Sequence, residues 1–131
     1  MKLDLDHLRG WIGNSQTQSE ILSPDLVTRF NATLGSESST ARGADAPLMV
    51  HFCLAQPVAP LDGLGEDGHP RRGGFLPPVP LPRRMWAGGG IEFEAPLIIG
   101  ADVTRQSTIT DIEVKSGWSG MLCFVTVVHE Y

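Results

Sequence analysis

Residues 103–128 read VTRQSTITDIEVKSGWSGMLCFVTVV, and this stretch decides the fold class. Residues 103–115 are rich in threonine, isoleucine and valine and predict a strand. Their apolar positions change phase between Ile109 and Ile112, which predicts a β-bulge or a strong bend. Residues 116–120 (SGWSG) predict a hairpin turn. Residues 121–128 are almost continuously apolar, so we expect them to form the innermost strand, covered on both faces.

The segments before this hairpin are less uniform. Residues 91–94 (IEFE) alternate between apolar and charged side chains, which predicts a strand. Pro96 and Gly100 bracket an expected turn at residues 97–99. Residues 13–20 are polar, and we expect a loop there. Residues 48–55 (LMVHFCLA) form a short apolar run for which periodicity does not decide between a buried helix and a strand.

Two helices are predicted in the N-terminal third. Ser23 is a typical N-cap residue, Pro24 suits the first helical position, and Gly35 is typical just past a helix end. Between them an apolar stripe repeats every four residues and predicts a helix over residues 24–34. The stripe consists of Leu26, Phe30 and Leu34. A short N-terminal helix is expected from apolar residues at near-helical spacing, which are Leu3, Leu5, Leu8 and Trp11.

The order of these elements predicts an α+β protein in which one long helix lies against a curled antiparallel sheet. A chain of 131 residues suits a single domain, and a hydrophobic fraction of 41 % is enough for one core. We therefore expect one domain over residues 1–131.

Charge and composition exclude several classes of function. The net charge of −5 argues against a nucleic-acid partner, because phosphate contacts need a basic face. No stretch reaches the ~18 apolar residues of a membrane span, and residues 1–11 lack the apolar core of a signal peptide. Cys53 and Cys123 lie in apolar runs and predict buried, reduced thiols. We expect a cytoplasmic protein without a metal site, a cofactor or a membrane partner.

A long loop precedes the strands. Residues 67–89 read DGHPRRGGFLPPVPLPRRMWAGG, which is too rich in proline and glycine for a helix or a central strand. The loop still contains apolar residues that a solvated linker would lack. These are Phe75, Leu76, Val79, Leu81, Met85 and Trp86. Such a loop is typically functional or packed on a partner.

Four stretches of the chain together resemble a known family. They are residues 68–78 (GHPRRGGFLPP), 83–89 (RRMWAGG), 96–103 (PLIIGADV) and 115–117 (KSG). From residue 11 to residue 131 the chain resembles the N-terminal half of the MaoC-like hydratases. Within them it is most similar to the mesaconyl-C4-CoA and 3-methylfumaryl-CoA hydratases.

The resemblance implies a hot-dog fold and an enoyl-thioester substrate, across whose double bond water adds reversibly. In this family an N-terminal and a C-terminal hot dog pack side by side. An Asp and a His on the C-terminal half, in a motif Gly-Asp-x-Asn-Pro-aliphatic-His, activate and position the water. Hydration needs one group to take a proton from water and another to deliver a proton to carbon.

The matching positions of this chain lack those groups. The motif would follow the predicted helix, at residues 35–40 (GSESST), where Gly35 is present but Ser36 stands in place of the Asp. No Asn-Pro follows, and no His lies nearby. We therefore expect no catalytic residue here. Because the sequence reaches Tyr131 after one hot dog, either the second half is a separate polypeptide or the chain is a lone subunit.

The candidate substrate-binding residues all lie in the long loop. They are Arg71, Arg72, Arg83, Arg84 and Trp86. Coenzyme A, implied by the resemblance, carries phosphates to which arginine makes bidentate contacts. Alternatively, the arginines are surface charge or pair with a partner subunit, and the tryptophan anchors the loop in the core or at an interface.

Three histidine and aspartate residues are candidate catalytic groups. Asp67 and His69 are a tempting acid–base pair, but neither has an obvious partner to set its pKa. A turn in which Asp67 accepts hydrogen bonds from nearby backbone N–H groups is favoured. His51 lies in an apolar run and is predicted to be a core histidine.

Three functions are consistent with the sequence. The first is a non-catalytic hot-dog half of an enoyl-CoA hydratase, acting on a mesaconyl-like CoA thioester and paired with a second hot dog or with itself. The second is a stand-alone hot-dog acyl-CoA thioesterase or dehydratase, which would need a helix-borne carboxylate or the Asp-x-Asn-Pro-x-His motif. The third is a non-enzymatic acyl-CoA binding module. The absence of both catalytic patterns favours the first.

Overall fold

The computed structural model describes residues 3–131. Residues 1 and 2 lie outside the described residues. They begin the segment of residues 1–11 that is expected to lack the apolar core of a signal peptide. The chain divides into two compact units, which are described separately. The first contains the described residues up to Thr17, then Pro57–Trp86 and Gln106–Glu130; the second contains Gln18–Gln56, Ala87–Arg105 and Tyr131.

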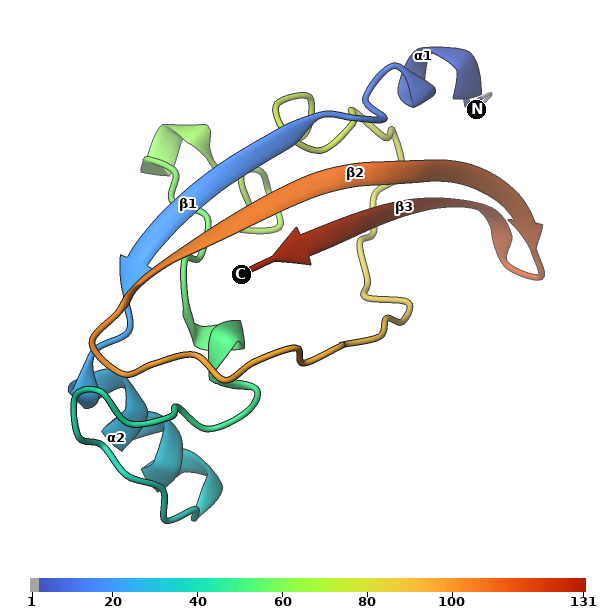
Figure 1. The fold of residues 1–131 in the computed structure, drawn as a ribbon. Helices are drawn as coiled ribbons and strands as arrows, with labels where there is room; N and C mark the ends of the chain where they lie inside the picture. Colours follow the sequence, from blue (N-terminus) through green and yellow to red (C-terminus); the bar gives the residue numbers. More distant parts are fainter. Residues whose placement is uncertain (1–2) are drawn as a thin grey trace. The chain divides into compact units, whose positions relative to one another are not determined.

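The strands are β1 (Ser15–Ile21), β2 (Asp102–Gly117) and β3 (Gly120–Glu130), in the sheet order β1-β2-β3. β2 and β3 are antiparallel and bend together along their length (Figure 1). The α+β class and the curled antiparallel sheet are therefore confirmed.

β2 has the interruption that its sequence predicts. Buried and exposed residues alternate up to Ile109, and the register with β3 then shifts between Ile109 and Asp111. Ile109 and Ile112 are both fully buried, so the bulge turns two apolar residues of opposite phase toward the same core. The predicted hairpin turn is also confirmed, because Gly117 pairs with Gly120 across Trp118 and Ser119.

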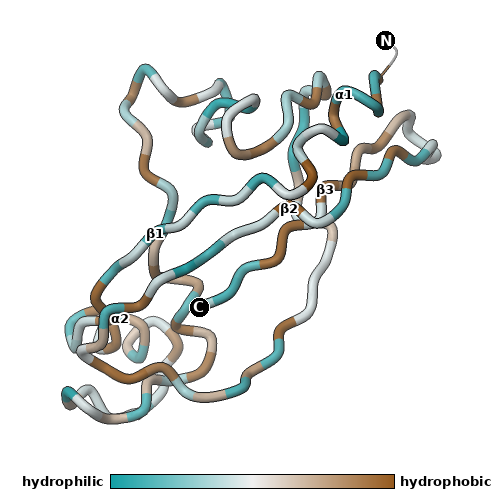
Figure 2. Tube along the Cα trace, turned by 45° about the horizontal axis from the view of Figure 1, so that its top comes forward, coloured by the Kyte–Doolittle hydropathy of each residue, from teal (hydrophilic) through white to brown (hydrophobic). Residues whose placement is uncertain are grey.

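The expectation that residues 121–128 form the innermost strand is wrong. β2 is the middle strand, and β3 lies at the end of the sheet formed by the described residues. Figure 2 shows that β3 is hydrophobic along much of its length. One face of β3, with Cys123, Val125 and Val127, packs into a core. The other face keeps Leu122 and Val128 exposed, so β3 is not covered on both faces by the described residues.

Two further predictions are wrong: a segment expected as a loop is a strand, and a segment expected as a strand is irregular. Residues 13–20, expected as a loop, contribute most of β1, because the strand is held by pairing with β2 and needs no apolar face. Residues 91–94, expected as a strand, have no regular structure, and both Ile91 and Phe93 are exposed. Alternation alone does not make a strand when no neighbouring strand pairs with it. The predicted turn at residues 97–99 is present, and Gly100 there has φ 93°.

Helix α2 (Pro24–Leu34) lies in the second unit and has the predicted bounds. The Ser23 Oγ accepts a hydrogen bond of 3.1 Å from the backbone N–H of Leu26, and Gly35 adopts φ 65°. The buried stripe is shifted from the predicted one. Val27 and Asn31 are its buried residues, and Leu34 is 63 % exposed.

The described residues also form three short helices: α1 (Leu5–Arg9), η1 (Val50–Cys53) and η2 (Leu61–Gly63). α1 confirms the expected N-terminal helix. η1 decides the open question at residues 48–55 in favour of a single 3₁₀ turn, which contacts α2. Cys53 and Cys123 form no disulfide, but Cys53 is exposed, so the prediction of two buried thiols is only partly right.

Each unit has its own core. In the second unit, residues from α2, η1 and the start of β2 pack together around Leu22, Val27 and Leu54. In the first unit, Ile109 and Ile112 are joined by the apolar residues of the long loop, which are Phe75, Leu76, Val79 and Leu81. The loop is thus packed, as expected from its composition. Met85 and Trp86 are the exceptions, since both side chains are 82 % exposed.

Candidate functional site

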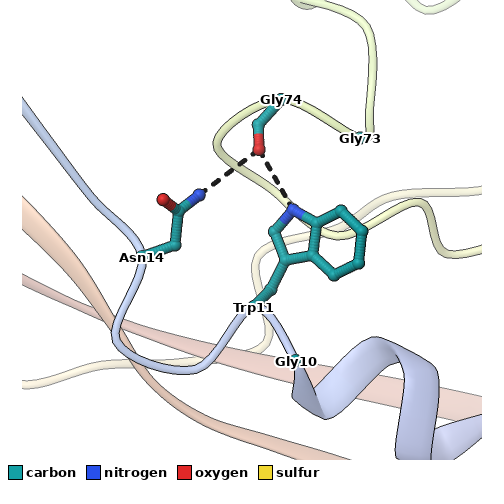
Figure 3. Close-up of a pocket in the computed structure, with 5 residues that line it drawn as sticks. All are labelled: Gly10, Trp11, Asn14, Gly73 and Gly74. Atoms are coloured by element: carbon teal, nitrogen blue, oxygen red, sulfur yellow. Dashed lines mark hydrogen bonds between the residues drawn. The ribbon is translucent and has the colours of Figure 1, made fainter.

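The long loop is fastened to the N-terminal segment of the first unit. The Trp11 Nε1–H donates to the Gly74 carbonyl at 3.0 Å, and the Asn14 amide donates to the carbonyls of Gly74 and Phe75 at 3.3 and 2.9 Å. Figure 3 shows both side chains pointing at the Gly74 carbonyl. An open hollow of about 410 Å³ lies between these residues. Its polar side chains, Trp11 and Asn14, already bond to the loop carbonyls, so we interpret them as anchors of the loop.

Asp67, His69 and Arg84 form a small polar cluster in this loop. The Asp67 carboxylate accepts a hydrogen bond of 3.1 Å from the His69 backbone N–H, as predicted for a turn. It also lies 3.4 Å from His69 Nδ1 and 3.7 Å from Arg84 Nε. The backbone hydrogen bond from His69, aided by Arg84, lowers the pKa of Asp67. The expectation that Asp67 has no partner is wrong, and a carboxylate kept ionised in this way is a poor proton donor.

Arg71 and Arg72 bind backbone carbonyls of their own loop. The Arg71 Nε–H donates to the Leu64 carbonyl at 3.2 Å. One Arg72 Nη donates to the Val79 carbonyl at 2.6 Å and also to the Leu81 carbonyl. The loop does not pair with a strand, so these arginine side chains supply the hydrogen bonds that its carbonyls need. Arg72 in particular holds the Pro-rich segment in place.

Arg83 and Trp86 remain available at the surface. Among residues 3–131, Arg83 has no hydrogen bond or ion pair, and the Trp86 ring lies almost entirely in solvent. The five predicted substrate-binding residues thus separate into two that brace the loop, one that pairs with Asp67, and two that are exposed. Trp86 does not anchor the loop in the core of the described residues.

The segment after α2 holds no acid–base pair. Asn31, buried in α2, donates from its amide to the Ser38 carbonyl at 3.1 Å. The hydroxyls of Ser36 and Ser38 donate to the Asn31 side-chain oxygen at 3.1 and 3.0 Å. Ser36 therefore helps to close the end of α2.

His51 lies among aromatic rings of the second unit. Its ring centroid is 4.4 Å from that of Phe52, 6.0 Å from that of Phe93 and 5.0 Å from that of Tyr131. Burial lowers the pKa of His51, since desolvation disfavours the imidazolium. His51 is only partly buried, so it is not the fully enclosed core histidine that the sequence predicts.

The sequence prediction missed Arg105. This residue follows Val103 on the inward face of β2, and its side chain is nearly completely buried. The signal was available: Val103, Arg105, Ser107 and Ile109 occupy alternate positions of one strand, so the two polar residues share a face with two apolar ones. A charged residue at an inward position is unusual enough to mark a site.

Among residues 3–131, no group of three or more His, Cys, Asp or Glu side chains is arranged to hold a metal ion. None of the helices in this part of the chain has the length and hydrophobicity needed to cross a membrane.

Comparison with known proteins identifies the family. Residues 49–131 match the family described as hydroxyacyl-thioester dehydratase type 2. The mesaconyl-C(4)-CoA hydratase of Chloroflexus aurantiacus is 43 % identical to this chain over 122 residues, which are 92 % of the chain. The aligned part is only 43 % of that relative, so the chain spans less than half of its length. The chain thus belongs to the hydroxyacyl-thioester dehydratase type 2 family, among the MaoC-like hydratases and dehydratases.

Proposed function

We propose that residues 1–131 form one hot-dog domain that serves as the non-catalytic half of an enoyl-CoA hydratase. The substrate would be a mesaconyl-like CoA thioester. The Asp and His that activate water would lie on a second hot dog, outside these residues. The observation that carries the proposal is the Asn31 network: the position that would bear the catalytic Asp is held by Ser36 in a helix-ending role.

The role of this half would be to bind and orient the thioester. Arg83 and Trp86 are exposed on the same short segment, and Arg84 lies beside them. A guanidinium suits a phosphate of coenzyme A, and an indole ring suits its adenine face. Arg71 and Arg72 would contribute indirectly, because their bonds to loop carbonyls fix the segment that presents Arg83.

Pairing with a second hot dog is part of the proposal. β3 ends the sheet of the described residues and carries exposed Leu122 and Val128 on its outer face. An unpaired edge with apolar side chains invites association. The partner would be a catalytic hot dog or another copy of this chain, in the cytoplasm.

The test compares the chain alone with the chain assembled with a hot dog that carries the Asp-x-Asn-Pro-x-His motif. Hydration is followed by the loss of enoyl-thioester absorbance with a mesaconyl thioester. We expect no turnover by the chain alone and turnover by the assembly, lost when the Asp of the motif is changed to Asn. Turnover by the pure chain would overturn the non-catalytic role, and hydrolysis of the thioester would support a thioesterase instead.

A further inference from the structure

Within the part of the chain that the structure describes, Arg105 is a buried cation without a counter-charge. The residue is 7 % exposed, and its Nε has no hydrogen-bond partner among residues 3–131. No carboxylate of the described chain lies within ion-pair distance of its guanidinium. A buried charge is costly unless it is paired and hydrogen-bonded, so such an arrangement needs a compensating group from elsewhere.

The neighbours of Arg105 on the same face of β2 carry no negative charge: they are Val103 and Ser107. Val103, two residues earlier on the same face of β2, belongs to the core of the second unit. Asp102 is the nearest acid in sequence, but it occupies the opposite face and is exposed. No acidic residue of β2 therefore forms an ion pair with the Arg105 guanidinium.

The strand register brings an aromatic group to Arg105. Gln106 pairs with Glu130 in the β2–β3 ladder, so the next pair along would be Arg105 and Tyr131. Residues directly opposite one another on antiparallel strands project to the same face. The Tyr131 ring in turn contacts His51. Continuing the ladder by one residue would therefore place Arg105 opposite Tyr131, whose hydroxyl can form hydrogen bonds.

We propose that Arg105 binds the free carboxylate of a dicarboxylic acid that is thioesterified at its other end. This inference rests on the proposed function and extends it to substrate selection. Mesaconate is a dicarboxylic acid, so a thioester at one carboxyl leaves the other as an anion. Guanidinium and carboxylate match in a bidentate pair, which would supply both the counter-charge and a partner for Nε.

The contact would select charged over neutral acyl groups. A neutral enoyl thioester of similar length leaves the buried guanidinium unpaired, whereas the dicarboxylic monothioester neutralises it. Arg105 would therefore be a specificity residue and take no part in proton transfer.

The experiment replaces Arg105 in the assembled hydratase and compares two substrates. The variants are Arg105→Met and Arg105→Lys, with exposed Arg29→Met of the same unit as the matched control. kcat/KM is measured with a mesaconyl thioester and with the neutral crotonyl thioester. We expect Arg105→Met to lower kcat/KM for the first by about 30-fold or more and to leave the second within about threefold. Arg105→Lys should be intermediate, and Arg29→Met should match the wild type.

A second measurement does not depend on turnover. Free mesaconate and the neutral amide crotonamide, which has no carboxylate, are titrated against the full chain while thermal unfolding is followed. Mesaconate should raise the midpoint of the wild type and not of Arg105→Met, and crotonamide should act weakly on both. Without ligand, Arg105→Met should unfold at the same or a higher temperature, because an unpaired buried charge is removed.

The outcomes separate this inference from the proposed function. If the assembly hydrates neither thioester while mesaconate binding still depends on Arg105, the proposed function fails and the carboxylate site stands. If the assembly is active and Arg105→Met lowers kcat/KM for both thioesters equally, Arg105 recognises the shared coenzyme A part and the inference is overturned. Loss of stability in Arg105→Met with unchanged mesaconate binding also overturns it.

Discussion

Ser107 Oγ and His129 Nδ1 lie 2.7 Å apart across the β2–β3 ladder, where the two residues form a direct pair. Ser107 is completely buried, so its hydroxyl has to be satisfied within the protein. The imidazole of His129 does this at the position just inside the C-terminal end of β3. A serine beside a histidine suggests a nucleophile and base, but the Ser107 hydroxyl is completely buried and already held by this hydrogen bond, so we interpret the pair as structural.

The first prediction concerns this pair. Ser107→Ala should lower the free energy of unfolding by about 1 kcal/mol, because one buried hydrogen bond is lost. Denaturant unfolding of the full chain measures the change. Thr110→Ala, which removes only an exposed contact of 3.5 Å to the Thr126 carbonyl, should change stability by less than about 0.5 kcal/mol. If Ser107→Ala abolished activity of the assembled enzyme at unchanged stability, the structural reading would be wrong.

The second prediction separates the arginines of the long loop. Arg72→Ala should destabilise the chain and expose the loop to proteolysis, because two backbone carbonyls lose their donor. Arg83→Ala should leave stability unchanged and weaken binding of a CoA thioester to the assembly by roughly tenfold, with a smaller effect at high salt. Binding isotherms at two salt concentrations check this. Unchanged affinity in an intact assembly removes the ligand role, and loss of assembly marks Arg83 as an interface residue.

The third prediction is a pH dependence from His51. Burial lowers its pKa below the ordinary value of 6.5, so below that value the unfolded chain binds more protons at this site than the folded chain does. The free energy of unfolding should therefore fall as the pH decreases through 6.5 and level off below the folded-state pKa. His51→Gln should flatten this part of the stability curve. A variant of the exposed His7, His7→Gln, should retain it, and a wild-type-like slope in His51→Gln would contradict the assignment.

The fourth prediction tests pairing through the outer face of β3. Replacing both Leu122 and Val128 by Lys should weaken association with the partner, because two exposed apolar residues at a sheet edge become charged. Sedimentation equilibrium at micromolar concentration measures the assembly. Val58→Lys, at a loop position that is 85 % exposed, is the control and should leave association intact. A wild type that is strictly monomeric, with no partner recovered from cells, would refute pairing altogether.

Local signals in the sequence were sufficient for several elements. Ser23 and Gly35 set the ends of α2, because a cap acts within one turn of its own helix. The bulge in β2 followed from the phase of Ile109 and Ile112, since side chains alternate strictly along a strand.

Pairing between distant segments decided the rest. β1 is a strand because it pairs with β2, although its own residues are mostly polar. Residues 91–94 are irregular although their pattern alternates. Both outcomes follow because strand formation depends on a partner far away in the sequence. Distant segments also decided the environment of Arg105. The printed sequence places Arg105 on an inward face, but only the folded chain leaves its Nε buried without a partner, since burial and ion pairing are set by neighbours that the local sequence does not specify.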